Sequence, residues 1–207
     1  KMPLKPTTNS LKKAQMQQSA IETATKSLLP KLKRGMRSDA VTDLVKFVLD
    51  ESGNMCALLG ILEHPEHHQK VQVQKAAWVL HRAFQSDPRG LFAHRQALSR
   101  ALDATDDTSV MREILKTLAS PIWLDLESED CRSDILQLAL DLLHVPTFPI
   151  AVHYAAMQII QTRAKTSRDE AAAAKAIRVL MDGLREQNAL FKCAAKHEAR
   201  IQKRINL

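Results

Sequence analysis

Hydrophobic residues return at the same helical spacing in three separate stretches of the chain. Counting from Gln72, apolar residues stand at offsets four, five and eight, and the same offsets from Val110 and Val152 are also apolar. The three triplets are Ala76, Ala77 and Leu80; Ile114, Leu115 and Leu118; and Ala156, Met157 and Ile160. The reference positions lie 38 and then 42 residues apart. This pattern predicts a repeat of about 40 residues with two helices per unit, in which each helix buries one stripe against its neighbours.

Further apolar stripes, capping residues and prolines divide the rest of the chain into helices. Candidate N-caps are Ser38 or Asp39, Asp107 or Thr108, Ser128, and Ser167, and Gly53 and Pro121 end helical units. After the first 35 residues, the pattern predicts helices over residues 41–49, 55–62, 72–85, 91–102, 108–119, 129–143, 150–164, 169–186 and 190–205. We therefore predict an all-α fold, with a right-handed α-α superhelix of about four helix pairs.

Residues 1–35 differ from the rest in composition. They contain two early prolines and then predict a helix from Asn9 or Ser10 to Leu29, ended by Pro30. The apolar face of this helix is thin, so it either docks on the first repeat as a cap or remains a solvated arm. We divide the chain into a basic, partly helical N-terminal arm (1–35) and a helical-repeat domain (36–207).

The net charge of +7 is concentrated in this arm. Residues 1–34 hold eight Lys or Arg and one Glu, whereas the remaining chain holds 22 basic and 22 acidic residues. Within that neutral part, an acidic patch is predicted from Asp125, Glu127, Glu129 and Asp130, and the last helix is basic. The arm is thus expected to give at most weak, sequence-independent binding to nucleic acid.

Composition narrows the class of protein further. Five glycines and one tyrosine, with long runs of Ala, Leu, Gln, Lys and Arg, argue against sheets. Cys56, Cys131 and Cys193 are odd in number and lie in apolar helical patterns, which predicts buried free thiols in a reducing, cytoplasmic protein. No run of apolar residues approaches the roughly 18 that span a bilayer, so no membrane association is expected.

Three stretches of the sequence resemble a known family. QKAAWVLHRAF, IAVHYAAMQII and HEARIQKRI look like segments of small bacterial HEAT-repeat proteins, which are armadillo-like. The resemblance covers roughly residues 40–207 and depends on generic packing motifs. It implies an α-solenoid, and it supplies no catalytic residue.

One set of residues is a candidate binding face. On the four helices that begin near Gln72, Val110, Val152 and Leu190, positions two and six residues further on should point away from the buried stripe, toward the concave side. These positions hold Gln74, Trp78, Arg112, Lys116, Tyr154, Gln158, Lys192 and Lys196. Aromatic and basic residues are enriched in binding sites, so a non-catalytic scaffold that binds an acidic protein or peptide is expected. The alternative is that they form only a solvated face.

Catalysis is not indicated by any motif. The loop of His64, Glu66, His67 and His68 is interrupted by Pro65, and no Cys or further carboxylate is placed to complete a closed zinc site. No Gly-rich phosphate loop is present, so no cofactor or metal is predicted. An alternative is a nucleic-acid-binding protein that resembles HEAT-like alkylpurine DNA glycosylases, with Trp78, Arg112, Lys116 and Tyr154 in its groove. Against it, the eight positions contain no Asp or Glu, and the repeat domain is neutral.

Overall fold

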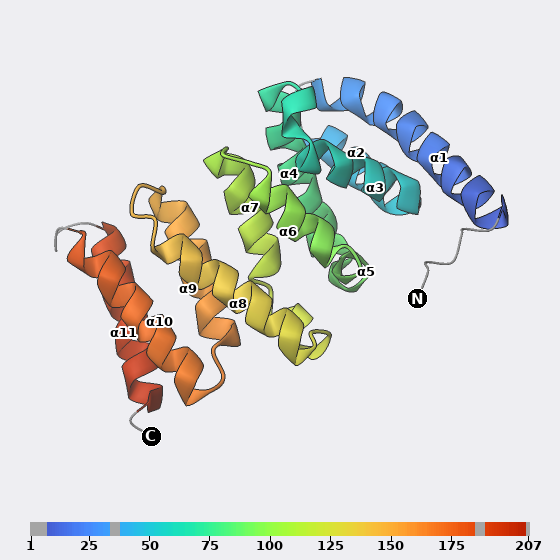
Figure 1. Cartoon of the computed structure of the whole chain (residues 1–207). Helices are drawn as coiled ribbons and strands as arrows, with labels where there is room; N and C mark the ends of the chain where they lie inside the picture. The colour runs from blue at the N-terminus through green and yellow to red at the C-terminus, as the bar shows by residue number, and fades with distance from the viewer. Residues whose placement is uncertain (1–7, 34–37, 185–188, 206–207) are drawn as a thin grey trace. The chain divides into compact units, whose positions relative to one another are not determined.

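A computed structural model describes residues 8–33, 38–184 and 189–205 of the chain (Figure 1). These residues form eleven α-helices and two 3-10 helices with no strand among them, which confirms the all-α prediction. The chain divides into two compact units, and each is described by itself. Unit 1 comprises Lys1–Ser86 and Gln96–Thr105, and unit 2 comprises Asp87–Arg95 and Asp106–Leu207.

Unit 1 is built from five α-helices. They are α1 (Thr8–Lys33), α2 (Ser38–Asp50), α3 (Ser52–Glu63), α4 (Lys70–Ser86) and, apart from its first residue, α6 (Arg95–Asp103), with a 3-10 helix at Pro65–His67. Helix α1 packs on α3 and α4, and α2 packs on the same two helices. Arg100 on α6 forms an ion pair with Glu63 on α3 at 2.9 Å. The core of unit 1 is therefore formed between the α1 to α4 helices.

Helix α1 extends beyond the end predicted for it. Pro30 lies inside the helix, which continues to Lys33, although proline removes one helical hydrogen bond. Leu28 and Leu32, on either side of the proline, are fully buried, so packing against the neighbouring helices offsets the lost bond. The side chain of Gln72 also donates a hydrogen bond to the carbonyl oxygen of Leu29 at 3.2 Å. The C-terminal half of α1 is thus an integral part of unit 1.

Unit 2 is built from six α-helices. They are α5 (Pro88–Phe92), α7 (Thr108–Leu118), α8 (Glu129–Leu143), α9 (Ile150–Arg163), α10 (Ser167–Asp182) and α11 (Ala189–Ile205), with a 3-10 helix at Pro121–Asp125. Helix α9 packs against α7, α8 and α11, while α10 packs against α8 and α11 (Figure 1). The helices predicted at Val110, Val152 and Leu190 therefore follow one another in a row.

Side-chain caps stabilise the starts of several helices. The carboxylate of Asp107 accepts hydrogen bonds from the backbone N–H groups of Ser109 and Val110, and the Ser128 hydroxyl accepts one from Cys131. The N-cap of α10 was predicted one residue too late, and the helix begins at Ser167 instead of Asp169. Thr166, rather than Ser167, is the N-cap, and it forms a capping box with Asp169.

Two other predictions differ from the structure. The single helix predicted over 91–102 is two helices, α5 and α6, separated by a turn at residues 93–94. The Phe92 ring before this turn lies edge-on to Trp123 at 5.5 Å and under the Arg95 guanidinium at 4.8 Å, and these contacts favour the break. Cys56, Cys131 and Cys193 are free thiols, as predicted, but each is partly exposed instead of buried.

A buried ion pair fixes the loop before α8 to the end of α9 within unit 2. The Arg163 guanidinium donates through Nε and Nη2 to the two carboxylate oxygens of Glu127, with the Nε bond at 3.2 Å, and neither side chain is exposed. The backbone N–H of Glu127 also donates to the carbonyl oxygen of Trp123, whose side chain is fully buried. Glu127 therefore does not belong to the predicted acidic patch, because its charge is inside the protein.

Candidate functional site

The cations predicted on α7 are held by a carboxylate between them. Arg112 Nη2 lies 2.9 Å from Glu113 Oε1, and Lys116 Nζ lies 3.1 Å from the same atom. Glu113 is buried, whereas Arg112 and Lys116 are each about two-fifths exposed, at 43% and 42%. The eight predicted positions contain no acid, but this neighbouring residue supplies one. The positive charge of α7 is thus offset by one negative charge, and its two side chains are held in fixed positions.

Helix α9 presents an aromatic and amide surface. Tyr154 is 46% exposed, and its ring meets the ring of His197 on α11 edge-on, with centroids 6.4 Å apart. Gln158 is half-buried one turn further along α9, and Gln161 is exposed. Arg200 on α11 donates a hydrogen bond to the Gln161 side-chain oxygen at 3.3 Å. Side chains of α9 and α11 therefore meet along one seam of unit 2.

Helix α11 carries a stripe of exposed cations beside this seam. Lys192, Lys196 and Arg200 recur every four residues, so they lie on one side of the helix, and all three are exposed. Among the described residues, no carboxylate lies within ion-pair distance of any of the three. The two nearby carboxylates are engaged elsewhere, Glu198 with Arg178 and Glu170 with Arg204. We call Tyr154, Gln158, Gln161, Lys192, Lys196 and Arg200 the α9–α11 face.

Two titratable groups at the base of this face are shifted toward their neutral forms. Burial lowers the pKa of His197, and the charge of Arg200 lowers it further. Burial raises the pKa of the Cys193 thiol, although Lys196 and Arg200 partly oppose this. A neutral imidazole and a protonated thiol add no charge, so the lysines and Arg200 determine the potential of the face.

The structure divides the eight predicted site residues between the two units. Arg112, Lys116, Tyr154, Gln158, Lys192 and Lys196 stand on α7, α9 and α11 of unit 2, which pack in a row. Gln74 and Trp78 stand on α4 of unit 1 and are half-buried. That all eight form a single binding face stays a prediction, whereas six of the eight stand on adjacent helices of one unit.

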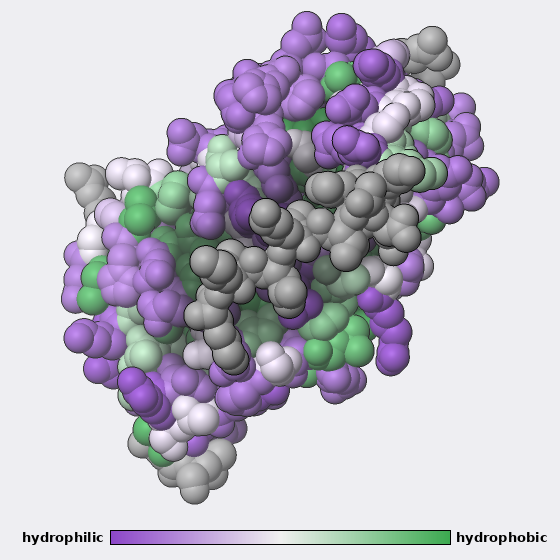
Figure 2. Space-filling model, turned by 45° about the vertical axis from the view of Figure 1, so that its right-hand side comes forward, coloured by the Kyte–Doolittle hydropathy of each residue, from purple (hydrophilic) through white to green (hydrophobic). Residues whose placement is uncertain are grey.

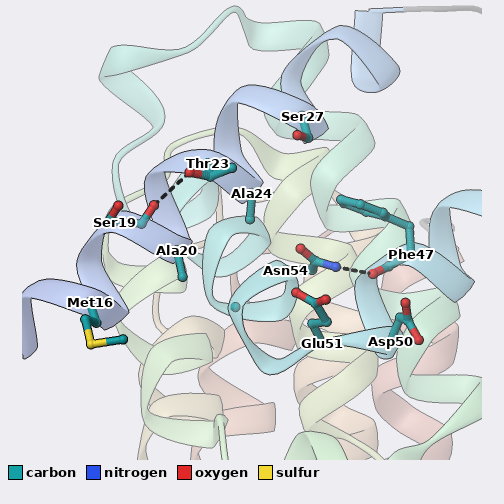
Figure 3. Close-up of a pocket in the computed structure, with 11 residues that line it drawn as sticks. Met16, Ser19, Ala20, Thr23, Ala24, Ser27, Phe47, Asp50, Glu51 and Asn54 are labelled. Carbon is teal, nitrogen blue, oxygen red and sulfur yellow. Dashed lines mark hydrogen bonds between the residues drawn. The ribbon is translucent and has the colours of Figure 1, made fainter. Parts of the chain in front are cut away.

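A pocket of about 590 Å³ lies under α1 in unit 1 (Figure 3). Helix α1 lines it with small residues, and the α2–α3 junction contributes Phe47, Asp50, Glu51 and Asn54. Its polar groups largely serve the backbone, since Thr23 donates to the carbonyl oxygen of Ser19 at 2.9 Å and Asn54 donates to that of Phe47 at 2.7 Å. No set of charged groups converges there among the described residues, so this pocket does not define a ligand.

The histidine-rich loop holds no arrangement suited to a metal. His64 and His67 flank Glu66, with nitrogen–oxygen distances of 3.7 and 3.4 Å, and all three side chains are largely exposed. In the part of the chain that the structure describes, no group of three or more His, Cys, Asp or Glu side chains could hold a metal ion. Polar contacts within an exposed loop account for these residues.

Hydrophilic residues predominate on the face seen in Figure 2, and apolar residues form scattered groups. Large exposed apolar side chains stand on separate elements, for example Val71 on α4, Tyr154 on α9 and Val179 on α10. None of the described helices is both long and apolar enough to cross a membrane. Compared with protein-family models, curated proteins and solved structures, the chain matches none of them. Any functional assignment must therefore be argued from the site itself.

Proposed function

We propose that the chain is a non-catalytic helical-repeat interaction module, and that an acidic protein or peptide segment binds along the α9–α11 face. The observation that carries this proposal is the stripe of exposed cations on α11, which no described carboxylate neutralises, beside the exposed ring of Tyr154. Acidic side chains complement such a stripe, and an exposed aromatic ring beside it adds apolar contact area.

The proposal includes the predicted architecture. In unit 2, the α7, α9 and α11 row and the contact between α8 and α10 agree with helix pairs stacked in two layers, as in HEAT and armadillo proteins. We propose that the predicted right-handed superhelix continues this stacking through the chain. Stacked repeats form long surfaces suited to extended segments, which favours a peptide-like ligand over a compact one.

Charge-reversal variants of α11 test the proposal. A blocked, fluorescein-labelled peptide rich in Glu is titrated into the full chain at low salt and followed by fluorescence anisotropy. Lys192→Glu together with Lys196→Glu should weaken binding by at least about ten-fold, because two attractive charges become repulsive. Raising the salt concentration should weaken the wild type as well, since exposed charges are screened.

The matched control changes the net charge by the same amount at another place in unit 2. Lys165 is exposed just before α10 and Lys175 is exposed on α10, so Lys165→Glu with Lys175→Glu should weaken peptide binding by less than about three-fold. Equal losses in both double variants would contradict a specific face. Tighter binding of duplex DNA than of the acidic peptide, removed by the α11 substitutions, would instead favour the nucleic-acid alternative.

A further inference from the structure

A groove in unit 1 has an apolar floor beside the guanidinium of Arg82, which pairs with no described carboxylate. It has a volume of about 510 Å³, within the range of roughly 300–1,000 Å³ that is usual for ligand sites. It is lined by one turn of α2 and two turns of α4, whose residues are Val41, Thr42, Val45, Trp78, Arg82, Gln85 and Ser86. Helices α2 and α4 pack together, so the groove follows the line along which they meet.

The apolar part of the groove comes from both helices. Val41 and Val45 stand one turn apart on α2 and are 6% and 8% exposed, so their methyl groups form a floor. Trp78 is half-buried on α4 and presents part of its indole ring to solvent. A floor of branched aliphatic residues beside an indole suits an apolar side chain of a ligand.

The polar part of the groove is Arg82. Its guanidinium lies over the Trp78 ring, 5.6 Å from the centroid, and Nη1 donates to the Gln85 side-chain oxygen at 3.2 Å. Stacking on an aromatic ring restrains the guanidinium, although the side chain is exposed. Among the described residues, Arg82 has no carboxylate partner. The remaining N–H donors of its fork are therefore available to a carboxylate, which arginine binds through two parallel hydrogen bonds.

We infer that this groove binds a peptide segment in which an apolar side chain stands next to an Asp or Glu. The apolar side chain lies on Val41 and Val45 against the Trp78 ring, and the acidic side chain pairs with Arg82. Charge complementarity with Arg82 selects the acidic residue, and the apolar floor of Val41 and Val45 selects its neighbour. This site lies in unit 1, so it is separate from the α9–α11 face and does not depend on the function proposed for that face.

A blocked hexapeptide with adjacent Leu and Glu, flanked by Gly, is the probe, and calorimetry measures its affinity for the full chain. Acrylamide quenching gives a second readout, because Trp123 is fully buried and Trp78 is accessible. We expect the peptide to protect Trp78 from acrylamide. Replacing Glu by Gln in the peptide, or Arg82→Gln in the protein, should each weaken binding about ten-fold, as expected for the loss of a charge-assisted hydrogen-bond pair.

Lys26→Gln is the matched control, since it removes one exposed positive charge from α1 in the same unit and should leave the affinity within about two-fold. A peptide with Ser in place of Leu should also bind more weakly, which separates the apolar contact from simple charge attraction. Equal affinity for the Glu and Gln peptides would overturn the proposal. It would also be overturned if a trinucleotide, and not the peptide, protected Trp78.

Discussion

Unit 2 places arginine and lysine in two contrasting settings. Arg163 is fully buried and forms two hydrogen bonds to the carboxylate of Glu127, whereas Lys192, Lys196 and Arg200 are exposed with no described carboxylate beside them. The first cation fixes a loop to a helix end, and the others remain available for a ligand. The pair around Glu113 is intermediate, because its carboxylate is buried and its two cations are partly exposed. The role of each cation therefore depends on the carboxylate that it meets.

The buried pair should give the largest effect when it is broken. Arg163→Met leaves the Glu127 carboxylate buried without a partner, and the free energy of unfolding should fall by about 3–5 kcal/mol. Urea unfolding, followed by the emission of the buried Trp123 of unit 2, measures the loss. The control Arg168→Met, at an exposed position on α10, should change the free energy of unfolding by less than about 0.5 kcal/mol.

Replacing both partners separates the loss of the pair from the loss of packing. Glu127→Leu combined with Arg163→Met should recover most of the stability lost in Arg163→Met, because no charge is then left buried. If the single Arg163 variant proved as stable as the control, the contrast between buried and exposed cations would fail.

Acidification should add positive charge to two buried histidines of unit 2 and thereby lower its stability. Burial lowers the pKa of His153, whose Nε2 lies 3.0 Å from the carbonyl oxygen of Val145, and burial together with Arg200 lowers that of His197. Both pKa values are lower in the folded than in the unfolded chain, where histidine titrates near 6.5. Below about pH 6.5 the unfolded state therefore binds more protons, and the stability present above that pH is lost as the pH falls.

The loss should be at most about 1.4 kcal/mol per pH unit for each of these histidines. Urea unfolding at a series of pH values between about 7.5 and 5.5 measures it. His197→Gln should reduce the slope of stability against pH, because one of the shifted groups is gone. A slope that is unchanged in this variant would show that His197 does not contribute.

The smallest effect on stability is expected for a substitution of Glu113, a buried carboxylate that pairs with two partly exposed cations. Glu113→Gln should lower the free energy of unfolding by about 1 kcal/mol or less, since the two cations that it holds are partly exposed. It should also release Arg112 and Lys116, so that α7 resembles α11, and strengthen binding of the Glu-rich peptide by a few-fold. Glu129→Gln makes the same charge change at an exposed position of α8 and should alter the affinity less. Equal effects would mean that net charge alone determines binding.

The sequence predicted features that depend on near neighbours. Caps such as Asp107 and Ser128, and the stripes that begin at Val110 and Val152, are local patterns, and the structure has helices where these patterns predict them. The pair of Glu127 and Arg163 is separated by 36 residues, so no spacing rule connects the two, and Glu127 was assigned to a surface patch. Glu113 was missed for a different reason: it stands between Arg112 and Lys116 of the predicted binding face and next to the buried stripe, where an acid was not considered.

The continuation of α1 through Pro30 and the turn at residues 93–94 were not predicted, because tertiary contacts override local propensity at both places. The buried positions of Leu28 and Leu32 hold α1 helical through a proline, and the rings of Phe92 and Trp123 favour a break where no glycine or proline marks one. The surface chemistry was predicted only by residue type. Which cations meet a carboxylate could be learned only from the structure.

The second half of helix α1 carries both buried apolar residues and exposed lysines. Ala24, Leu28 and Leu32 are buried, whereas Lys26, Lys31 and Lys33 on the same stretch are exposed. Substitutions of these exposed lysines can therefore change the charge of the helix without removing a side chain from the core of unit 1. Changes at the buried positions act on the core directly. The charge of the helix can therefore change in evolution while its buried stripe is kept.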